Sequence, residues 1–127
     1  MEDLPKPMDG AVFYEDAKLY ACLANNPKSK GHCVVVWKKR VRDIHSLSRK
    51  NFLHLMDITE KVHNVLMKVT KTTKVYMMYL DEIKHIHWHL IPRYKIAGYT
   101  LLKEKPKQLQ EKDLKLASKL YKELKKK

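Results

Sequence analysis

Three of the seven histidines alternate with bulky apolar residues in the segment 85–93, which reads His-Ile-His-Trp-His-Leu-Ile-Pro-Arg. Side chains two residues apart share one face of a β-strand, about 6.6 Å from each other, whereas a helix would spread them around its axis. The alternation therefore predicts a strand that stops at Pro92, with His85, His87 and His89 in one row and the apolar residues on the core face. Clustered imidazoles repel when protonated, so we interpret the row as a functional site rather than as structure alone.

The length and composition of the chain indicate one folded domain. Its 127 residues are 44% hydrophobic, enough for a single core. Because no apolar run is long enough to span a membrane and no signal-peptide pattern opens the chain, we expect a soluble, cytoplasmic protein. Cys22 and Cys33 lack the C-x-x-C spacing of a zinc or redox motif and are expected to be reduced, buried thiols.

The chain is strongly basic. Lysine and arginine number 27 against 14 acidic residues, a formal net charge of +13, which favours anionic partners. Many lysines lie in the last third, which ends in three consecutive lysines. A solvated helix face or tail explains them more simply than nucleic-acid binding, because aromatic residues that would stack on bases are not interleaved with them. Nucleic acid stays a second possible partner.

The hydrophobic patterns predict an α+β fold with about five strands in an antiparallel sheet. A long helix begins after the N-cap Ser48 and packs on one face of the sheet. The strands are expected at 11–14, 19–24, 32–37, 75–80 and 85–92, a turn at 81–84, the helices at 49–69 and 110–124, an irregular lead-in at 1–10, the main domain at 11–105 and a lysine-rich C-terminal helix and tail at 106–127.

The histidine segment resembles the signature of the histidine triad (HIT) nucleotide-binding superfamily, His-φ-His-φ-His-φ-φ, in which φ is apolar. The segment 31–36, Gly-His-Cys-Val-Val-Val, resembles the second landmark of that family, and the likeness covers roughly residues 11–95. The resemblance implies a homodimer that transfers a nucleotidyl group through a covalent nucleotidyl-histidine and releases a nucleoside monophosphate. Known branches act on dinucleoside polyphosphates, nucleoside phosphoramidates or adenylylated adducts, and a distant branch transfers uridylyl groups to sugar phosphates.

By position, the resemblance implies a role for each of four histidines. His87 would attack the α-phosphorus, His89 would contact the α-phosphate and the leaving group, and His85 and His32 would brace the site. The chemistry suits these side chains, because a neutral imidazole is nucleophilic near pH 7. Crowding should leave one imidazole neutral for attack while another stays protonated for the leaving group.

The expected binding residues depart from the family pattern. The resemblance implies a Gly-Gln-Ser/Thr loop that contacts phosphate, but the segment 79–84 reads Tyr-Leu-Asp-Glu-Ile-Lys. We therefore expect Lys84 and backbone N–H groups to bind the phosphate. The Asn or Asp that holds the ribose in the family corresponds to Ala24, and we expect Asn25 to substitute for it, with Leu23 also contacting the nucleotide.

Two other functions stay open. Three imidazoles at this spacing could hold zinc with an open fourth position. The acidic pair Asp81-Glu82 and the basic C-terminus instead suggest a weakly catalytic protein that binds nucleotides or nucleic acid. The preferred interpretation is an enzyme with a small nucleotide substrate and no resident cofactor, in which a divalent metal is present only as part of the substrate complex.

Overall fold

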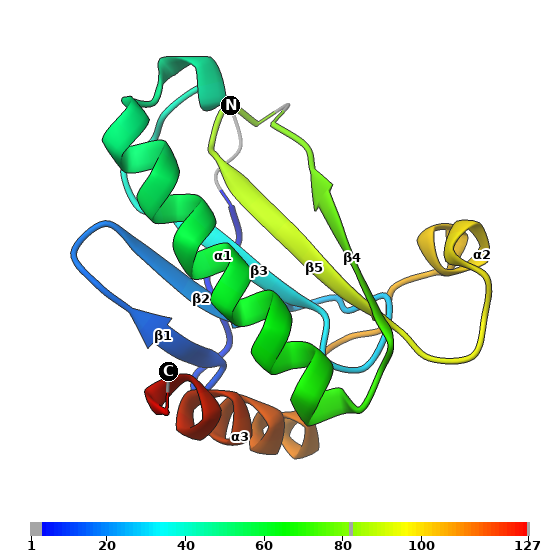
Figure 1. The fold of residues 1–127 in the computed structure, drawn as a ribbon. Helices are drawn as coiled ribbons and strands as arrows, with labels where there is room; N and C mark the ends of the chain where they lie inside the picture. The colour runs from blue at the N-terminus through cyan, green and yellow to red at the C-terminus, as the bar shows by residue number, and fades with distance from the viewer. Residues whose placement is uncertain (1–3, 82, 127) are drawn as a thin grey trace.

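The computed structural model describes residues 4–81 and 83–126, with all their side chains except that of Tyr99. Five antiparallel strands form one sheet in the spatial order β1-β2-β3-β5-β4, and the helix α1 lies across one face of it (Figure 1). The strands are β1 Val12–Glu15, β2 Leu19–Leu23, β3 Cys33–Trp37, β4 Lys74–Tyr79 and β5 His87–Arg93. The arrangement confirms the predicted α+β class.

The long helix α1 spans Arg49–Thr70 and begins where the sequence predicts. The hydroxyl of Ser48 accepts a hydrogen bond from the Asn51 N–H at 3.1 Å, which satisfies one of the free N–H groups of the first turn. The helix ends at Lys71, whose φ of 58° lies in the left-handed region. No helix within the described residues is long and apolar enough to cross a membrane.

The C-terminal region folds back onto the body of the domain. The expected helix at 110–124 is divided into a 3-10 turn at Glu111–Asp113 and the helix α3 at Leu114–Lys125. The helix α3 packs against α1 and β1 (Figure 1), and its Leu120 is fully buried. The lysines that alternate with these apolar residues are left exposed, so this part of the basic excess is a solvated helix face, as expected.

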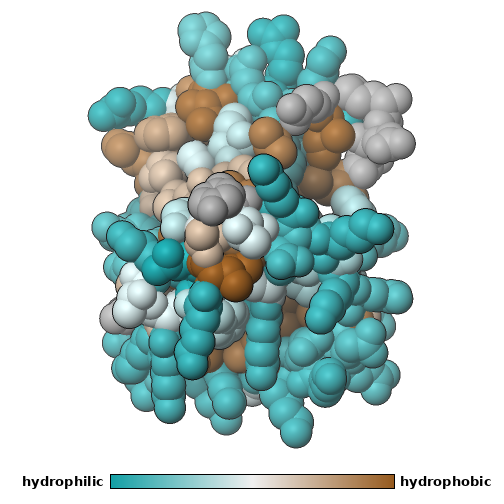
Figure 2. All heavy atoms as spheres, turned by 90° about the vertical axis from the view of Figure 1, so that its right-hand side faces the viewer, coloured by the Kyte–Doolittle hydropathy of each residue, from teal (hydrophilic) through white to brown (hydrophobic). Residues whose placement is uncertain are grey.

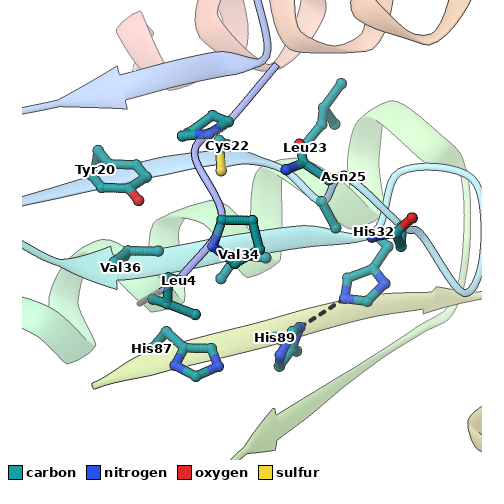
Figure 3. Close-up of a pocket in the computed structure, with 14 residues that line it drawn as sticks. Leu4, Tyr20, Cys22, Leu23, Asn25, His32, Val34, Val36, His87 and His89 are labelled. Carbon is teal, nitrogen blue, oxygen red and sulfur yellow. Dashed lines mark hydrogen bonds between the residues drawn. The ribbon is translucent and has the colours of Figure 1, made fainter. Parts of the chain in front are cut away.

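The two faces of the sheet differ in character. Residues that point toward α1 form the core, among them Leu19, Ala21, Cys33, Val35 and Leu90, each of which is fully buried. The alternate residues of the same strands point to the other face. That second face lies opposite α1 and carries His87 and His89 (Figure 3).

Two local predictions need correction. β5 begins at His87, so His85 precedes the strand, and it passes through Pro92 to end at Arg93. The pairing of β3 with β5 ends at Val36 and His87, one residue before β3 itself ends at Trp37. The segment before His87 therefore does not continue the strand. A short helix, α2 at Gly98–Lys103, was not predicted, because six residues are too few to show a helical period.

The turn before the histidine segment forms as expected. The Lys84 N–H donates to the Asp81 carbonyl oxygen at 2.8 Å, and Lys84 adopts a φ of 56°. The other acidic residue of this turn, Glu82, lies outside the described residues.

Candidate functional site

A hollow of about 180 Å³ lies on the face of the sheet opposite α1 (Figure 3). Alternate residues of β2, β3 and β5 form its floor, and the N-terminal segment passes over it. The side chains that line it from the floor are mostly apolar, with three histidines at one side. The lining residues are Leu4, Pro5, Pro7, Tyr20, Cys22, Leu23, Ala24, Asn25, Asn26, His32, Val34, Val36, His87 and His89.

The three imidazoles at this hollow come from two distant parts of the chain. His87 and His89 alternate along β5 and pair with Val36 and Val34 of β3, while His32 immediately precedes β3. The ring centroids of His87 and His89 are 5.0 Å apart, and those of His32 and His89 are 5.1 Å apart, both in edge-to-face geometry. The antiparallel pairing of β3 with β5 therefore assembles the cluster.

A chain of hydrogen bonds fixes which nitrogen carries the proton in two of these rings. The backbone N–H of Lys28 donates to His32 Nδ1 at 3.0 Å, so the neutral His32 ring carries its proton on Nε2. His32 Nε2 lies 2.9 Å from His89 Nδ1 and donates to it (Figure 3). A neutral His89 then carries its proton on Nε2, where it can donate to a ligand.

His87 is fixed in the opposite sense. Its Nδ1 lies 2.8 Å from the backbone carbonyl oxygen of His85. Because a carbonyl only accepts, Nδ1 must be the protonated nitrogen. In the neutral ring, the lone pair is then on His87 Nε2, the atom with which a nucleophilic imidazole attacks.

Burial keeps two of the three rings uncharged. Desolvation lowers the pKa of His32 to about 3, with smaller contributions from His89 and from the positive charge of Lys28. Desolvation likewise lowers the pKa of His89 to about 4, helped by His87 and Lys28. The expectation that one imidazole stays protonated does not hold for this pair, because a further proton on either ring would break the hydrogen-bond chain.

The first histidine of the motif does not join a row of three. His85 Nε2 donates to the Trp37 carbonyl oxygen at 2.6 Å, so its ring is turned to the end of β3. Its contribution to the cluster is the backbone carbonyl that holds His87. The alternation in the sequence cannot reveal this difference, since it depends on where β3 ends.

Three expected binding residues are placed in different ways. Asn25 lines the hollow, but its Oδ1 accepts from the Met8 N–H at 3.2 Å and its Nδ2 donates to the Lys6 carbonyl at 2.8 Å. Leu23 also lines the hollow, although its side chain is buried in the core. Lys84 is exposed in its turn and is not among the described residues that line the hollow, so its role stays a prediction.

Sequence reasoning missed most of the apolar lining. Tyr20, Cys22, Val34 and Val36 could have been found from period-two alternation, because they share a face with His87 once the strands pair. The N-terminal residues that cover the hollow carry no comparable signal, since an irregular lead-in does not reveal its docking site.

The geometry bears on the zinc alternative. Within residues 4–81 and 83–126, no group of three or more His, Cys, Asp or Glu side chains is arranged to hold a metal ion. That alternative needed the three imidazoles of the motif in one row, and the His85 ring binds the Trp37 carbonyl instead.

Comparisons with known proteins agree with the fold and the motif. A family model described as the HIT domain matches residues 6–96. An uncharacterized HIT-like protein of Methanocaldococcus jannaschii is 32% identical over 95 residues, which cover 68% of this chain and 71% of that protein.

Two solved structures share the fold at low sequence identity. A hypothetical histidine triad nucleotide-binding protein of Sulfolobus tokodaii has a TM-score of 0.76 at 18% identity, covering 91% of this chain and 84% of its own. The diadenosine triphosphate hydrolase of Plasmodium falciparum has a TM-score of 0.75 at 17% identity, covering 94% and 80%. Because the family model matches residues 6–96, which are most of the chain, this protein belongs to the HIT domain family.

Proposed function

We propose that this chain is a nucleotidyl hydrolase or transferase that acts at an α-phosphate through a covalent intermediate on His87. The hydrogen bond from His87 Nδ1 to the His85 carbonyl carries the proposal. In the neutral ring it leaves Nε2 unprotonated, on a side chain that lines the hollow. A neutral imidazole with one nitrogen held and the other free is suited to attack on phosphorus.

In the first step, the lone pair of His87 Nε2 forms a bond to the α-phosphorus. The bond from phosphorus to the leaving oxygen breaks, and its electron pair departs with that oxygen as an anionic phosphate. His87 becomes an N-phosphorylated imidazolium that still donates Nδ1–H to the His85 carbonyl, whose partial negative charge stabilises the cation.

In the second step, a water molecule attacks the same phosphorus. The bond from phosphorus to Nε2 breaks, its electron pair returns to His87, and the released nucleoside monophosphate carries the water oxygen. The surplus proton of the water passes to the product or to solvent. If another acceptor takes the place of water, the same intermediate gives nucleotidyl transfer.

The neutral state of His89 supports one substrate class over another. With Nδ1 occupied by His32, His89 offers an N–H donor at Nε2 that can hydrogen-bond the oxygens that gain charge in the transition state. It has no second proton to give. Phosphate leaving groups depart as anions and need none, whereas an alkyl amine does. We therefore propose dinucleoside polyphosphates ahead of nucleoside phosphoramidates, in line with the name of the Plasmodium falciparum relative.

The proposed enzyme works with imidazole and backbone donors and needs no resident metal. Prolonged dialysis against a chelator should leave turnover essentially unchanged once the chelator is removed. Loss of activity that zinc alone restores would favour the metal-binding alternative.

We also propose a homodimer. β4 lies at the edge of the sheet, and Met77 on that strand is 39% exposed. Leu80, just after the strand, is 46% exposed. An unpaired apolar edge is an aggregation liability unless another chain covers it. Sedimentation at micromolar concentration should show a dimer, and a monomer alone would remove this claim.

A reducing compartment such as the cytoplasm fits the two cysteines. Cys22 lines the hollow, and Cys33 is fully buried in the core on the other face of the sheet. Neighbouring strands therefore hold them on opposite sides, where they cannot bond to each other.

The experiment that tests the function is hydrolysis of diadenosine triphosphate in ¹⁸O-labelled water. Attack at the α-phosphorus should place the label in AMP and leave ADP unlabelled. The His87→Gly variant should be inactive, while His63→Ala, which removes a histidine from α1 outside the site, should match the wild type. Label in ADP, or equal activity of His87→Gly, would contradict the proposal.

A further inference from the structure

A second hollow, of about 620 Å³, lies beside the loop that leads into His32. It is formed by the segments 27–30 and 107–113, which are far apart in the sequence. Four lysines line it: Lys28, Lys30, Lys107 and Lys112. The one carboxylate among its described lining residues, Asp113, accepts the Gln110 N–H at 2.9 Å and so serves its own turn.

An adjoining hollow of about 250 Å³ extends this basic surface. It shares Lys28 and Lys107 with the hollow of about 620 Å³ and adds Lys95 and Lys105. Glu104 is the carboxylate among its described lining residues. Figure 2 shows hydrophilic side chains crowded over the lower half of the face that carries α2. We call the combined surface the basic groove, formed by Lys28, Lys30, Lys95, Lys105, Lys107 and Lys112.

The walls of the basic groove are held together by hydrogen bonds across the chain. The Lys107 N–H donates to the Pro27 carbonyl at 3.0 Å, and the Leu109 N–H donates to the Asn25 carbonyl at 2.8 Å. Lys28 Nζ donates to the carbonyls of Leu102 and Glu104 at 3.0 and 3.2 Å. The lysines are therefore gathered on a fixed backbone, not on a free tail.

An aromatic ring stands among these lysines. Tyr94 lines the adjoining hollow, is 40% exposed, and donates its hydroxyl to the Lys30 carbonyl at 2.6 Å. That bond fixes the ring while leaving part of it open to solvent. Exposed aromatic faces within a positive groove are the combination that binds single strands, since bases stack on the ring while lysines meet the phosphates.

We propose that the basic groove and Tyr94 bind single-stranded nucleic acid. From the sequence alone, the lack of aromatic residues interleaved with the lysines of the last third argues against nucleic-acid binding there. The fold brings Lys28 and Lys30 beside lysines of residues 95–112, around Tyr94, which follows β5 directly. This binding is separate from the chemistry proposed at His87.

The test is fluorescence anisotropy with a fluorescein-labelled oligothymidylate of about 15 nucleotides, a length that one such groove can cover. Lys107→Glu/Lys112→Glu should lose about tenfold or more in affinity and show a shallower salt dependence, because phosphate contacts are removed. Lys39→Glu/Lys50→Glu is the matched control, since it makes the same charge change just after β3 and in the first turn of α1, outside the groove, and should stay within about threefold. Equal loss in both double variants would reduce the binding to net charge and overturn the proposal.

Two substitutions of Tyr94 separate stacking from loop positioning. Tyr94→Phe keeps the ring and loses the bond to Lys30, whereas Tyr94→Leu loses both. We expect Phe to bind like the wild type and Leu to lose about fivefold or more. If Leu binds as well as Phe, and inorganic polyphosphate displaces the oligonucleotide as efficiently as unlabelled oligothymidylate, the groove is a phosphate site only and the proposal fails.

Two measurements keep this result apart from the proposed activity. Thermal unfolding followed by circular dichroism should show that each variant is folded. His87→Gly should bind the oligonucleotide as the wild type does, so that failure of nucleotidyl transfer would leave the binding result intact. Conversely, Lys107→Glu/Lys112→Glu should hydrolyse diadenosine triphosphate normally if only the groove is damaged.

Discussion

His32 Nε2 and His89 Nδ1 lie 2.9 Å apart, with their ring planes at 63°, although 57 residues separate them in the chain. The pairing of β3 with β5 creates this contact. Because the Lys28 N–H occupies the other nitrogen of His32, the contact sets the proton of His89 on Nε2. One backbone donor thus determines which atom of His89 can face a ligand.

Removing the Nε2–H donor of His89 should slow the turnover of all substrates by a similar factor. His89→Ala eliminates an N–H that hydrogen-bonds developing charge, and loss of one such donor typically costs about 10²–10³ in rate. Turnover should be compared for diadenosine triphosphate and for nucleoside phosphoramidates with amines of increasing pKa. A loss that grows steeply with leaving-group pKa would mean that His89 transfers a proton, contrary to the neutral state described here.

The two buried histidines should make the protein less stable in mild acid. In the folded state the pKa values of His32 and His89 are lowered to about 3 and about 4. Their unfolded values are about 6.5, so below pH 6.5 the unfolded chain takes up protons that the folded chain refuses. The free energy of unfolding should therefore fall between pH 7 and pH 5, by about 2 kcal/mol for His32 and by less for the more exposed His89.

Urea unfolding at the two pH values checks this dependence. The variant His32→Gln/His89→Gln should lose most of it, because neither position can then bind a proton in the unfolded chain. His63→Ala should retain it. An unfolding free energy for the wild type that is unchanged or rises from pH 7 to pH 5 would show that the rings are not held neutral.

The docking of the N-terminal segment over the hollow should depend on Asn25. Its side-chain amide bonds the backbone of Lys6 and Met8, in a segment whose Leu4 and Pro7 line the hollow. Asn25→Ala should release that segment, raise the KM for the nucleotide several-fold and change kcat much less. Hydrogen exchange at the Met8 amide should accelerate in the same variant.

The neighbouring Asn26→Ala provides the control, since Asn26 also lines the hollow but is exposed. It should leave both KM and the Met8 exchange rate close to those of the wild type. If Asn25→Ala lowers kcat strongly at unchanged KM, Asn25 acts on the reaction and not through the segment.

Local patterns in the sequence predict much of this fold. The apolar, β-prone runs at 19–24 and 32–37 mark two strands, and Ser48 marks the start of α1, because hydrophobic runs and capping are properties of short segments. The histidine motif likewise locates the reactive strand. These features need no knowledge of what packs against them.

The details of the site depend on contacts that no short segment contains. The place of His85 follows from the end of β3, some fifty residues earlier in the chain. Asn25 is engaged by the backbone of residues 17 and 19 positions away, a contact that its own place in the sequence does not reveal. The neutral state of His32 and His89 follows from burial, which composition does not give.

The central claim, covalent attack by His87, is tested most directly by trapping the intermediate. A substrate with a radioactive α-phosphate is mixed with excess protein, quenched in alkaline detergent and separated by size. We predict label on the wild-type chain and on His63→Ala, released by acid as expected for a phosphorus–nitrogen bond, and none on His87→Gly. Product formation by the wild type without label ever entering the protein would show direct attack by water and contradict the account.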